Sequence, residues 1–95
     1  MKKVLITRKL LKACEEKASK IFDVKLNSND ELYSQSKLIE LIQGCDAILS
    51  SLTEKMDEDT INKLSKSVKI ISNFAVGFGN IDLEAAKKRG ITVTN

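Results

Sequence analysis

The stretch Ser72–Asp82, which reads SNFAVGFGNID, carries the strongest information on fold and function in this chain. The apolar run Val68–Ile71 before it is typical of a buried strand, and Leu83–Arg89 after it is typical of a helix. Gly77 and Gly79 lie two residues apart, so main-chain N–H groups here can face a ligand without obstruction by side chains. Open α/β sheets bind ligands at loops that follow the carboxyl ends of their strands. We therefore predict that this loop binds a small anion and that the chain carries only part of the site.

Two kinds of apolar segment indicate the strands. Continuous runs are typical of strands buried on both faces, and alternating segments are typical of strands with one solvated face. The continuous runs occupy 4–6, 46–49 and 68–71, and the alternating segments occupy 22–27 and 91–94. Since buried strands belong in the centre of a sheet, we predict an α/β fold. It is a flavodoxin-like, parallel five-stranded sheet in the order 2-1-3-4-5, with helices on both faces.

Helical segments with recognisable ends separate these strands. They are expected at about 9–20, 28–43, 57–67 and 82–89. The spacing in Ser28–Glu31 is that of a capping box, which predicts the start of the second helix. Asp57 and Asp82 are predicted N-caps of the third and fourth helices, and Gly90 is the expected C-terminal turn residue. Cys14 falls on the apolar stripe predicted for the first helix.

Composition narrows the class of protein. Ninety-five residues, 42% of them hydrophobic, are expected to form one domain. The 16 basic and 13 acidic residues are spread along the chain, which argues against a nucleic-acid partner. No apolar run approaches the ~18 residues of a membrane span, and Val4–Ile6 is too short for the core of a signal peptide. We therefore expect no membrane partner and a cytoplasmic protein in which Cys14 and Cys45 pack as reduced thiols.

The polar residues exclude several kinds of catalytic chemistry. The chain has no histidine, so the commonest general base and zinc ligand is missing, and we predict no catalytic residue and no metal site in it. Ser50, Ser51 and Thr53 have no evident base, so we expect their hydroxyls to form hydrogen bonds within a loop. Arg8 is the one cation expected near the predicted site. The alternative is that Arg8 is only a solvated charge at the start of a helix.

Other binding functions share this arrangement of strands. Gly77-x-Gly79 weakly resembles a dinucleotide fingerprint, but its third glycine would fall at Asp82, whose carboxylate would repel a pyrophosphate. A phosphoacceptor receiver domain needs acidic residues where this chain has Thr7-Arg8 and Ser50-Ser51, so that function is rejected. A tight turn that needs glycine for its backbone angles remains an alternative to a carboxylate-binding loop.

A longer segment around the same loop resembles a known family. The matching residues are VGFGNIDL at 76–83, AA at 85–86 and KRGITVTN at 88–95. They are similar to the segment V-G-x-D-N-I-D-L-x-A-A-x-x-R-G-I-x-V-x-N of the D-isomer-specific 2-hydroxyacid dehydrogenases. Weaker similarity covers 46–49, 52–53 and 68–72. Gly79 departs from the family, which usually has aspartate there, but the resemblance extends over nearly the whole chain.

The resemblance implies that substrate binding and cofactor binding belong to two different domains. Family members have a flavodoxin-like substrate domain interrupted by a Rossmann-type NAD(P) domain. Residues 1–95 would then be the N-terminal segment of the substrate domain, and the NAD(P)-binding domain would be absent from this chain. The resemblance implies that N–H groups at Val76 and Gly77 bind the substrate carboxylate and that Ser51, Leu52 and Thr53 flank the substrate. The family's substrate-binding arginine and its histidine–glutamate pair would lie in the missing portion.

The resemblance also implies an activity for the full-length protein. It would transfer a hydride between NAD or NADP and a small 2-oxo or 2-hydroxy acid, as a homodimer that associates mainly through the absent domain. The short Leu52-Thr53 loop is similar to the glyoxylate/hydroxypyruvate reductase branch. This chain alone would bind no cofactor and would be inactive. Two alternatives stay open: a free-standing flavodoxin-like module that binds a small carboxylate without catalysis, and a fragment that associates through its open edge at 91–95.

Overall fold

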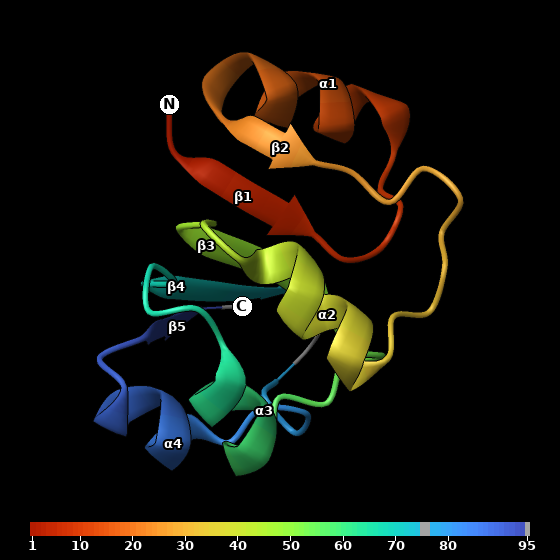
Figure 1. Cartoon of the computed structure of the whole chain (residues 1–95). Helices are drawn as coiled ribbons and strands as arrows, with labels where there is room; N and C mark the ends of the chain where they lie inside the picture. The colour runs from red at the N-terminus through yellow and green to blue at the C-terminus, as the bar shows by residue number, and fades with distance from the viewer. Residues whose placement is uncertain (75–76, 95) are drawn as a thin grey trace.

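A computed structural model describes residues 1–74 and 77–94 of the chain. Across the described residues the chain forms a five-stranded parallel sheet in the order β2-β1-β3-β4-β5, with four helices (Figure 1). The strands are β1 (Lys3–Ile6), β2 (Asp23–Lys25), β3 (Ala47–Ser51), β4 (Ile70–Phe74) and β5 (Thr92–Thr94). The helices are α1 (Lys12–Ile21), α2 (Gln35–Ile42), α3 (Glu58–Lys63) and α4 (Leu83–Lys88). The predicted fold class, parallel pairing and strand order are confirmed.

One face of the sheet forms the main core. Leu5, Ile48 and Ile71 lie in register on the three central strands, and each is at most 1% exposed. They belong to one apolar cluster with side chains of the last three helices. Those helix residues are Leu38, Ile42, Ile61, Ala85 and Ala86. Figure 1 shows α2, α3 and α4 gathered apart from α1. Removing this apolar surface from water is the main stabilising contribution to the fold.

The opposite face of the sheet is covered only in part. Val4, Ile6, Leu49 and Ile70 line a largely apolar groove of about 450 Å³ together with residues of α1 and β2. Ile70 is 44% exposed, and none of the side chains of α1, all of them described, is buried. The prediction of burial on both faces is therefore wrong for β4 and holds only in part for β3, whose Leu49 is half-buried, whereas in β1 the neighbouring Leu5 and Ile6 are both 1% exposed. Helix α1 lies beside β2 and leaves this face of β3 and β4 open (Figure 1).

The two cysteines differ for the same reason. Cys14, on the predicted stripe of α1, is exposed, whereas Cys45, just before β3, is fully buried. The Cys45 thiol donates to the carbonyl oxygen of Leu41 over 3.8 Å, and its burial raises its pKa. The prediction of a packed thiol is confirmed for Cys45. It is wrong for Cys14, because α1 begins later than predicted and rests on the half-covered face.

The segment between β2 and α2 also differs from the prediction. Helix α2 begins after the N-cap Ser34, so the capping box predicted at Ser28–Glu31 is wrong. The buried Asn27 side chain accepts a hydrogen bond from the Glu31 amide at 3.0 Å and donates to the Glu31 carbonyl at 2.8 Å. Asp30, with φ 50°, lies in the left-handed region. Side-chain bonds of this kind compete with helix formation, which explains the extended segment.

The starts of the last two helices are as predicted. Asp57 accepts a hydrogen bond from the Thr60 amide at 2.9 Å, and Asp82 accepts one from the Ala85 amide at 3.0 Å. These bonds satisfy N–H groups that the first turn of a helix would otherwise leave free. Gly90, with φ 70°, follows α4 in the left-handed conformation expected of a C-terminal turn. The loops before α3 and α4 are therefore anchored at their helical ends.

Candidate functional site

The site is built on the carboxyl ends of β3 and β4, which extend further than predicted. Ser50 pairs with Asn73 across the two strands, and both side chains are almost fully buried. The Ser50 hydroxyl donates to Asn73 Oδ1 at 3.1 Å. The predicted loops therefore begin later, and this edge of the core ends in a buried polar layer.

The loops that follow these two strands lie against each other. The Met56 amide donates to the Asn80 carbonyl at 2.7 Å, and the Asp82 amide donates to the Met56 carbonyl at 2.8 Å. Met56 and Ile81 thereby form a parallel bridge outside the main strands. The expectation that the two loops sit side by side is confirmed, and the bridge brings Ser51–Thr53 close to the glycine loop.

The Asn80 side chain joins the two loops a second time. Its Nδ2 donates to the Ser51 carbonyl at 3.0 Å and to the Glu54 carbonyl at 2.9 Å. Its Oδ1 accepts a hydrogen bond of 2.9 Å from Nδ2 of Asn73. One side chain of the glycine loop thus bonds the backbone of the neighbouring loop and the buried polar layer, which fixes the distance between the loops.

The glycine loop keeps an open surface. Gly77 has φ 81°, a conformation that glycine adopts without strain. Apart from its chain neighbours, a methyl group added at Gly77 or at Gly79 would meet no atom of the described residues within 4 Å, so neither glycine is required to avoid a clash with them. Val76, the other residue expected to bind a carboxylate, lies outside the described residues. The backbone at Gly77 therefore requires glycine for its angle, and the space beside it is free.

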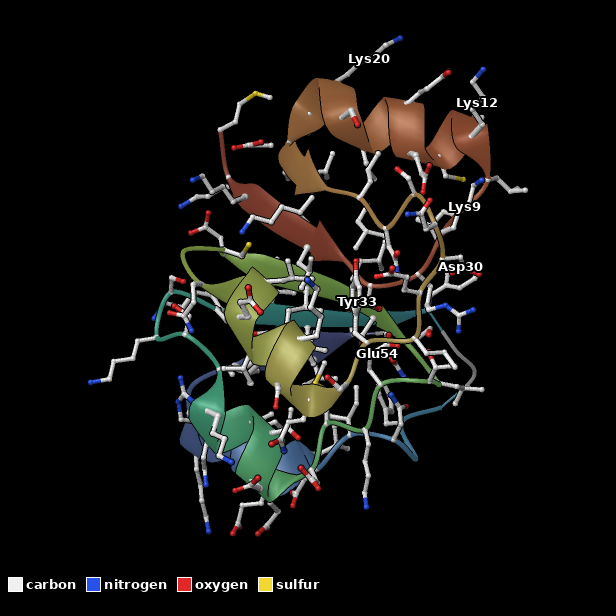
Figure 2. The ribbon with its side chains drawn as sticks, turned by 45° about the vertical axis from the view of Figure 1, so that its right-hand side comes forward. Lys9, Lys12, Lys20, Asp30, Tyr33 and Glu54 are labelled. Carbon is white, nitrogen blue, oxygen red and sulfur yellow. The ribbon has the colours of Figure 1, made fainter. Side chains whose placement is uncertain are left out.

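The predicted substrate-flanking residues divide into two groups. The Ser51 hydroxyl donates to Glu54 Oε1 at 3.2 Å, and the Thr53 hydroxyl donates to Glu54 Oε2 at 2.5 Å. Leu52, between them, is 64% exposed. Figure 2 shows Glu54 inside the molecule near Tyr33, whereas Lys12 and Lys20 reach outward from α1. The loop therefore presents an apolar side chain outward and turns both hydroxyls inward.

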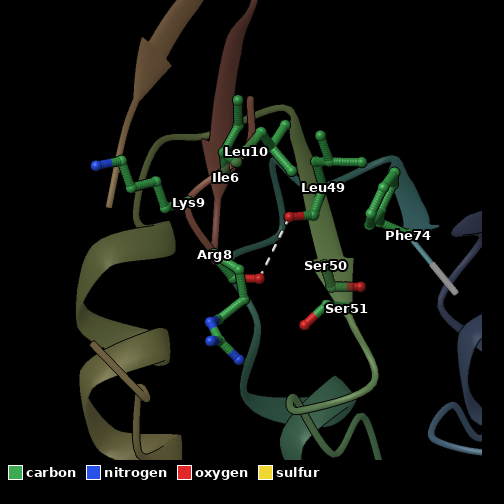
Figure 3. A pocket seen from close by; sticks show the side chains of 9 residues that line it. Ile6, Arg8, Lys9, Leu10, Leu49, Ser50, Ser51 and Phe74 are labelled. Atoms are coloured by element: carbon green, nitrogen blue, oxygen red, sulfur yellow. Dashed lines mark hydrogen bonds between the residues drawn. The ribbon is translucent and has the colours of Figure 1, made fainter. Parts of the chain in front are cut away.

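A cavity of about 180 Å³ lies where the carboxyl ends of β1, β3 and β4 meet. Figure 3 shows Arg8 and Ser51 on one side of this cavity, whereas the Lys9 side chain points away from it. Arg8 forms a two-point pair with Asp30, with Nε–Oδ1 at 2.7 Å and Nη2–Oδ2 at 3.0 Å. Its Nη1 donates to Thr53 Oγ1 at 3.1 Å. Hydrogen bonding from Arg8 holds the pKa of Asp30 well below its usual range, and Asp30 in turn raises the pKa of Arg8. The cation expected near the site is thus present, and it is engaged by Asp30 and Thr53.

Comparison with known proteins establishes the family. The model of the D-isomer specific 2-hydroxyacid dehydrogenase catalytic domain matches residues 4–95. The chain belongs to this family. The resemblance read from residues 76–95 is confirmed, and it extends over nearly the whole chain as expected.

Individual members of the D-2-hydroxyacid dehydrogenase family agree with this assignment. The chain is 37% identical over 94 residues to a glycerate dehydrogenase of Hyphomicrobium methylovorum, covering 99% of this chain and 29% of that one. It is 36% identical over 93 residues to a glyoxylate reductase of Thermococcus litoralis, covering 98% and 28%. A crystal structure described as an NAD-binding D-isomer specific 2-hydroxyacid dehydrogenase from Polaromonas sp. JS6 66 superposes with a TM-score of 0.92 at 28% identity, covering 98% of this chain and 29% of that one. The chain spans less than a third of the length of the curated relatives it matches.

The glycine loop does not match the dinucleotide-binding fingerprint. Asp82 stands where the fingerprint needs its third glycine, and its carboxylate caps α4 at the position a pyrophosphate would occupy. Across residues 1–74 and 77–94, no group of three His, Cys, Asp or Glu side chains could hold a metal ion. None of the described helices is long and apolar enough to cross a membrane. The open features of this edge include the glycine loop, Leu52 and Phe74, of which the two side chains are 64% and 70% exposed.

Sequence reasoning missed three side chains that hold this edge together. Glu54, Asn73 and Asn80 received no role, although together they link the two loops. Asn80 carried a signal, since it lies within the segment that resembles the family. Glu54 had only a weak signal, an acidic residue directly after a hydroxyl-rich strand end. Its burial depends on Thr7, which is 47 residues away in the sequence.

Proposed function

We propose that this chain is the N-terminal segment of the substrate domain of an NAD- or NADP-dependent D-2-hydroxyacid dehydrogenase. The full-length protein would interconvert a small 2-oxo acid and the corresponding 2-hydroxy acid, of the glyoxylate or hydroxypyruvate class. Family membership and relatives described as glycerate dehydrogenase and glyoxylate reductase support this activity. A bound NAD or NADP would supply the hydride to C2 of the 2-oxo acid or accept it in the reverse direction, with a proton taken up or released at the oxygen on C2.

The glycine loop is the observation that carries the proposal. It follows a central strand at the carboxyl edge of a parallel sheet, where folds of this class bind their ligands. Gly77 combines a left-handed backbone with free space beside it. We assign the N–H groups of Val76 and Gly77 to the substrate carboxylate, because oriented main-chain amides bind an anion without a cation.

The neighbouring loop would bind the rest of the substrate. Ser51, Leu52 and Thr53 flank the glycine loop, and Leu52 is the outward side chain among them. A leucine at this place would contact the carbon chain of a short acid and limit its size. The role of this chain in catalysis is therefore orientation of the substrate toward the hydride donor, which the remainder of the protein would hold.

Three further features belong to the same proposal. The full-length protein would bind NAD or NADP in a separate Rossmann-type domain, in keeping with the NAD-binding description of the Polaromonas relative. It would be a homodimer that associates mainly through that domain. We also place it in the cytoplasm, and the two free cysteines are compatible with a reducing compartment.

The test is an activity assay on two forms of the protein. The full-length protein should oxidise NADH or NADPH when glyoxylate or hydroxypyruvate is added, and the 95-residue chain should not. Absence of turnover by the full-length protein with every short 2-oxo acid would overturn the proposal. Tight binding of glyoxylate by the 95-residue chain in calorimetry, together with an inactive full-length protein, would instead support a carboxylate-binding module.

A further inference from the structure

We propose that Glu54 is a positioning residue that holds the Ser51–Thr53 loop in the shape that receives the substrate. This inference rests on the function proposed above and adds a role for a side chain that does not itself reach the open surface. Glu54 is 3% exposed, although it lies directly after an exposed loop. A buried carboxylate at this place requires an explanation, because removal of a charge from water is costly unless hydrogen bonds replace the lost hydration.

The Glu54 carboxylate receives its hydrogen bonds from the loop and from the end of β1. Oε1 accepts from the Ser51 amide at 2.9 Å and from the Ser51 hydroxyl at 3.2 Å, and it also accepts from the Thr7 hydroxyl. Oε2 accepts from the Thr53 hydroxyl at 2.5 Å. None of the ion pairs among the described residues includes Glu54. Neutral donors alone satisfy the carboxylate, and two residues of the loop provide most of them.

This arrangement determines which side chain the loop shows to a ligand. With the hydroxyls of Ser51 and Thr53 turned toward Glu54, Leu52 is left pointing away from the interior and is 64% exposed. Loss of the Glu54 carboxylate would free both hydroxyls to rotate, and Leu52 would no longer have a single position. Glu54 therefore acts on the substrate side of the loop through Ser51 and Thr53.

Apolar packing cannot provide the same hold, because hollows lie on both sides of the loop. The cavity of about 180 Å³ borders Ser51, and a second cavity of about 210 Å³ borders Thr53 and Glu54. Two polar links reinforce the position of the loop: Arg8 donates to Thr53 Oγ1 at 3.1 Å, and Asn80 donates to the Glu54 carbonyl at 2.9 Å. Hydrogen bonds centred on Glu54 thus fix a loop that side-chain packing leaves loose.

The test compares Glu54→Ala, Glu54→Gln and Thr53→Val in the full-length protein. Glu54→Ala should raise KM for glyoxylate by about tenfold and lower kcat by less, with KM for NADH or NADPH within about twofold of the wild type. Glu54→Gln retains the shape and one acceptor oxygen, so it should recover most of the affinity. Thr53→Val should raise KM for glyoxylate by about threefold alone and add little to Glu54→Ala, because both changes break one network. Glu40→Ala, at an exposed position in α2, is the matched control and should leave all parameters unchanged.

Hydrogen exchange gives a readout that does not need activity. A peptide covering residues 50–55 should exchange faster in Glu54→Ala than in the wild type, because the Ser51 amide loses its acceptor. An unchanged exchange rate and an unchanged KM for glyoxylate would overturn the role of Glu54. If Glu54→Ala changed KM for glyoxylate and KM for the cofactor equally, and Thr53→Val had no effect, the role of Glu54 would be general structural support and the proposal would fail. A wild-type protein that is inactive toward 2-oxo acids would refute the proposed function, while the exchange experiment would still decide whether Glu54 holds the loop.

Discussion

Two adjacent layers of the same sheet face are equally buried but chemically opposite. The first layer consists of Leu5, Ile48 and Ile71. The second, one step closer to the carboxyl edge, consists of Thr7, Ser50 and Asn73. No side chain in either layer is more than 2% exposed. The apolar layer stabilises the fold by its removal from water, whereas buried polar groups add little net stability and must each find a partner.

The comparison teaches why the site lies where it does. All buried side-chain nitrogen and oxygen atoms in the described part of the chain have hydrogen-bond partners. In the polar layer those partners include Asn80 and Glu54, which belong to the two loops beyond the strands. Because the buried polar side chains need hydrogen-bond partners from the loops, these hydrogen bonds determine where the loops lie. The apolar layer beneath them provides the rigid support.

The largest expected effect contrasts one residue from each layer. Ile48→Ala should lower the free energy of unfolding by about 3 kcal/mol, because it leaves a cavity in the core. Ser50→Ala should lower it by about 1 kcal/mol, because it removes one neutral hydrogen bond to Asn73 Oδ1, which keeps only a longer contact of 3.3 Å with the shared Asn80 Nδ2. Urea unfolding followed by circular dichroism measures both values. Similar losses for the two variants would contradict the proposed division of roles.

A smaller effect is expected where the polar layer meets the loops. Asn80→Ala should lower the free energy of unfolding by about 2 kcal/mol, since the carbonyls of Ser51 and Glu54 both lose a donor. It should also raise KM for the 2-oxo acid in the full-length protein, because the loops are no longer held together. Asn62→Ala, at an exposed position in α3, is the control and should change neither quantity. A loss of stability without any change in KM would show that the spacing of the loops does not matter for binding.

The two glycines of the loop provide a third, matched pair. Gly77→Ala should lower the free energy of unfolding by about 1 kcal/mol, because alanine is strained at φ 81°. Gly79→Ala should change it by less than about 0.5 kcal/mol, since no described residue other than its chain neighbours has an atom within 4 Å of the added methyl group. If the N–H group of Gly77 binds the substrate carboxylate, Gly77→Ala should also raise KM for the acid more than Gly79→Ala does. Equal values of KM for the two variants would argue against that assignment.

The sequence was sufficient for the sheet but not for the polar layer. A continuous apolar segment is typical of a central strand and an alternating one of an edge strand. These patterns therefore predicted which strands are central, and hence the order of the sheet. The capping box at Ser28 failed because the Asn27 side chain bonds the backbone of Glu31, and a long-range bond to the Thr7 carbonyl, which no local pattern contains, holds Asn27 in place. Glu54 was missed because one of its donors is the Thr7 hydroxyl, 47 residues away, although its other donors, Ser51 and Thr53, are near neighbours in the sequence. The uncovered face of β3 and β4 was missed because apolar runs indicate surface that favours burial, and they do not show what covers it.

The smallest expected effect concerns the ion pair between Arg8 and Asp30, which flanks the polar layer from the solvent side. Its hydrogen bonds lower the pKa of Asp30 from its ordinary value of 3.8, so the folded state binds the Asp30 proton less readily than the unfolded state. The pair therefore adds stability at neutral pH, and this contribution is lost as the pH falls below about 4 toward the pKa in the folded protein. Asp30→Asn should be slightly less stable than the wild type at pH 7, and its stability should fall less steeply between about pH 4 and pH 2. The difference should shrink at high salt, because both side chains of the pair are partly exposed. Parallel pH profiles for wild type and variant would show that the ion pair contributes nothing measurable to stability.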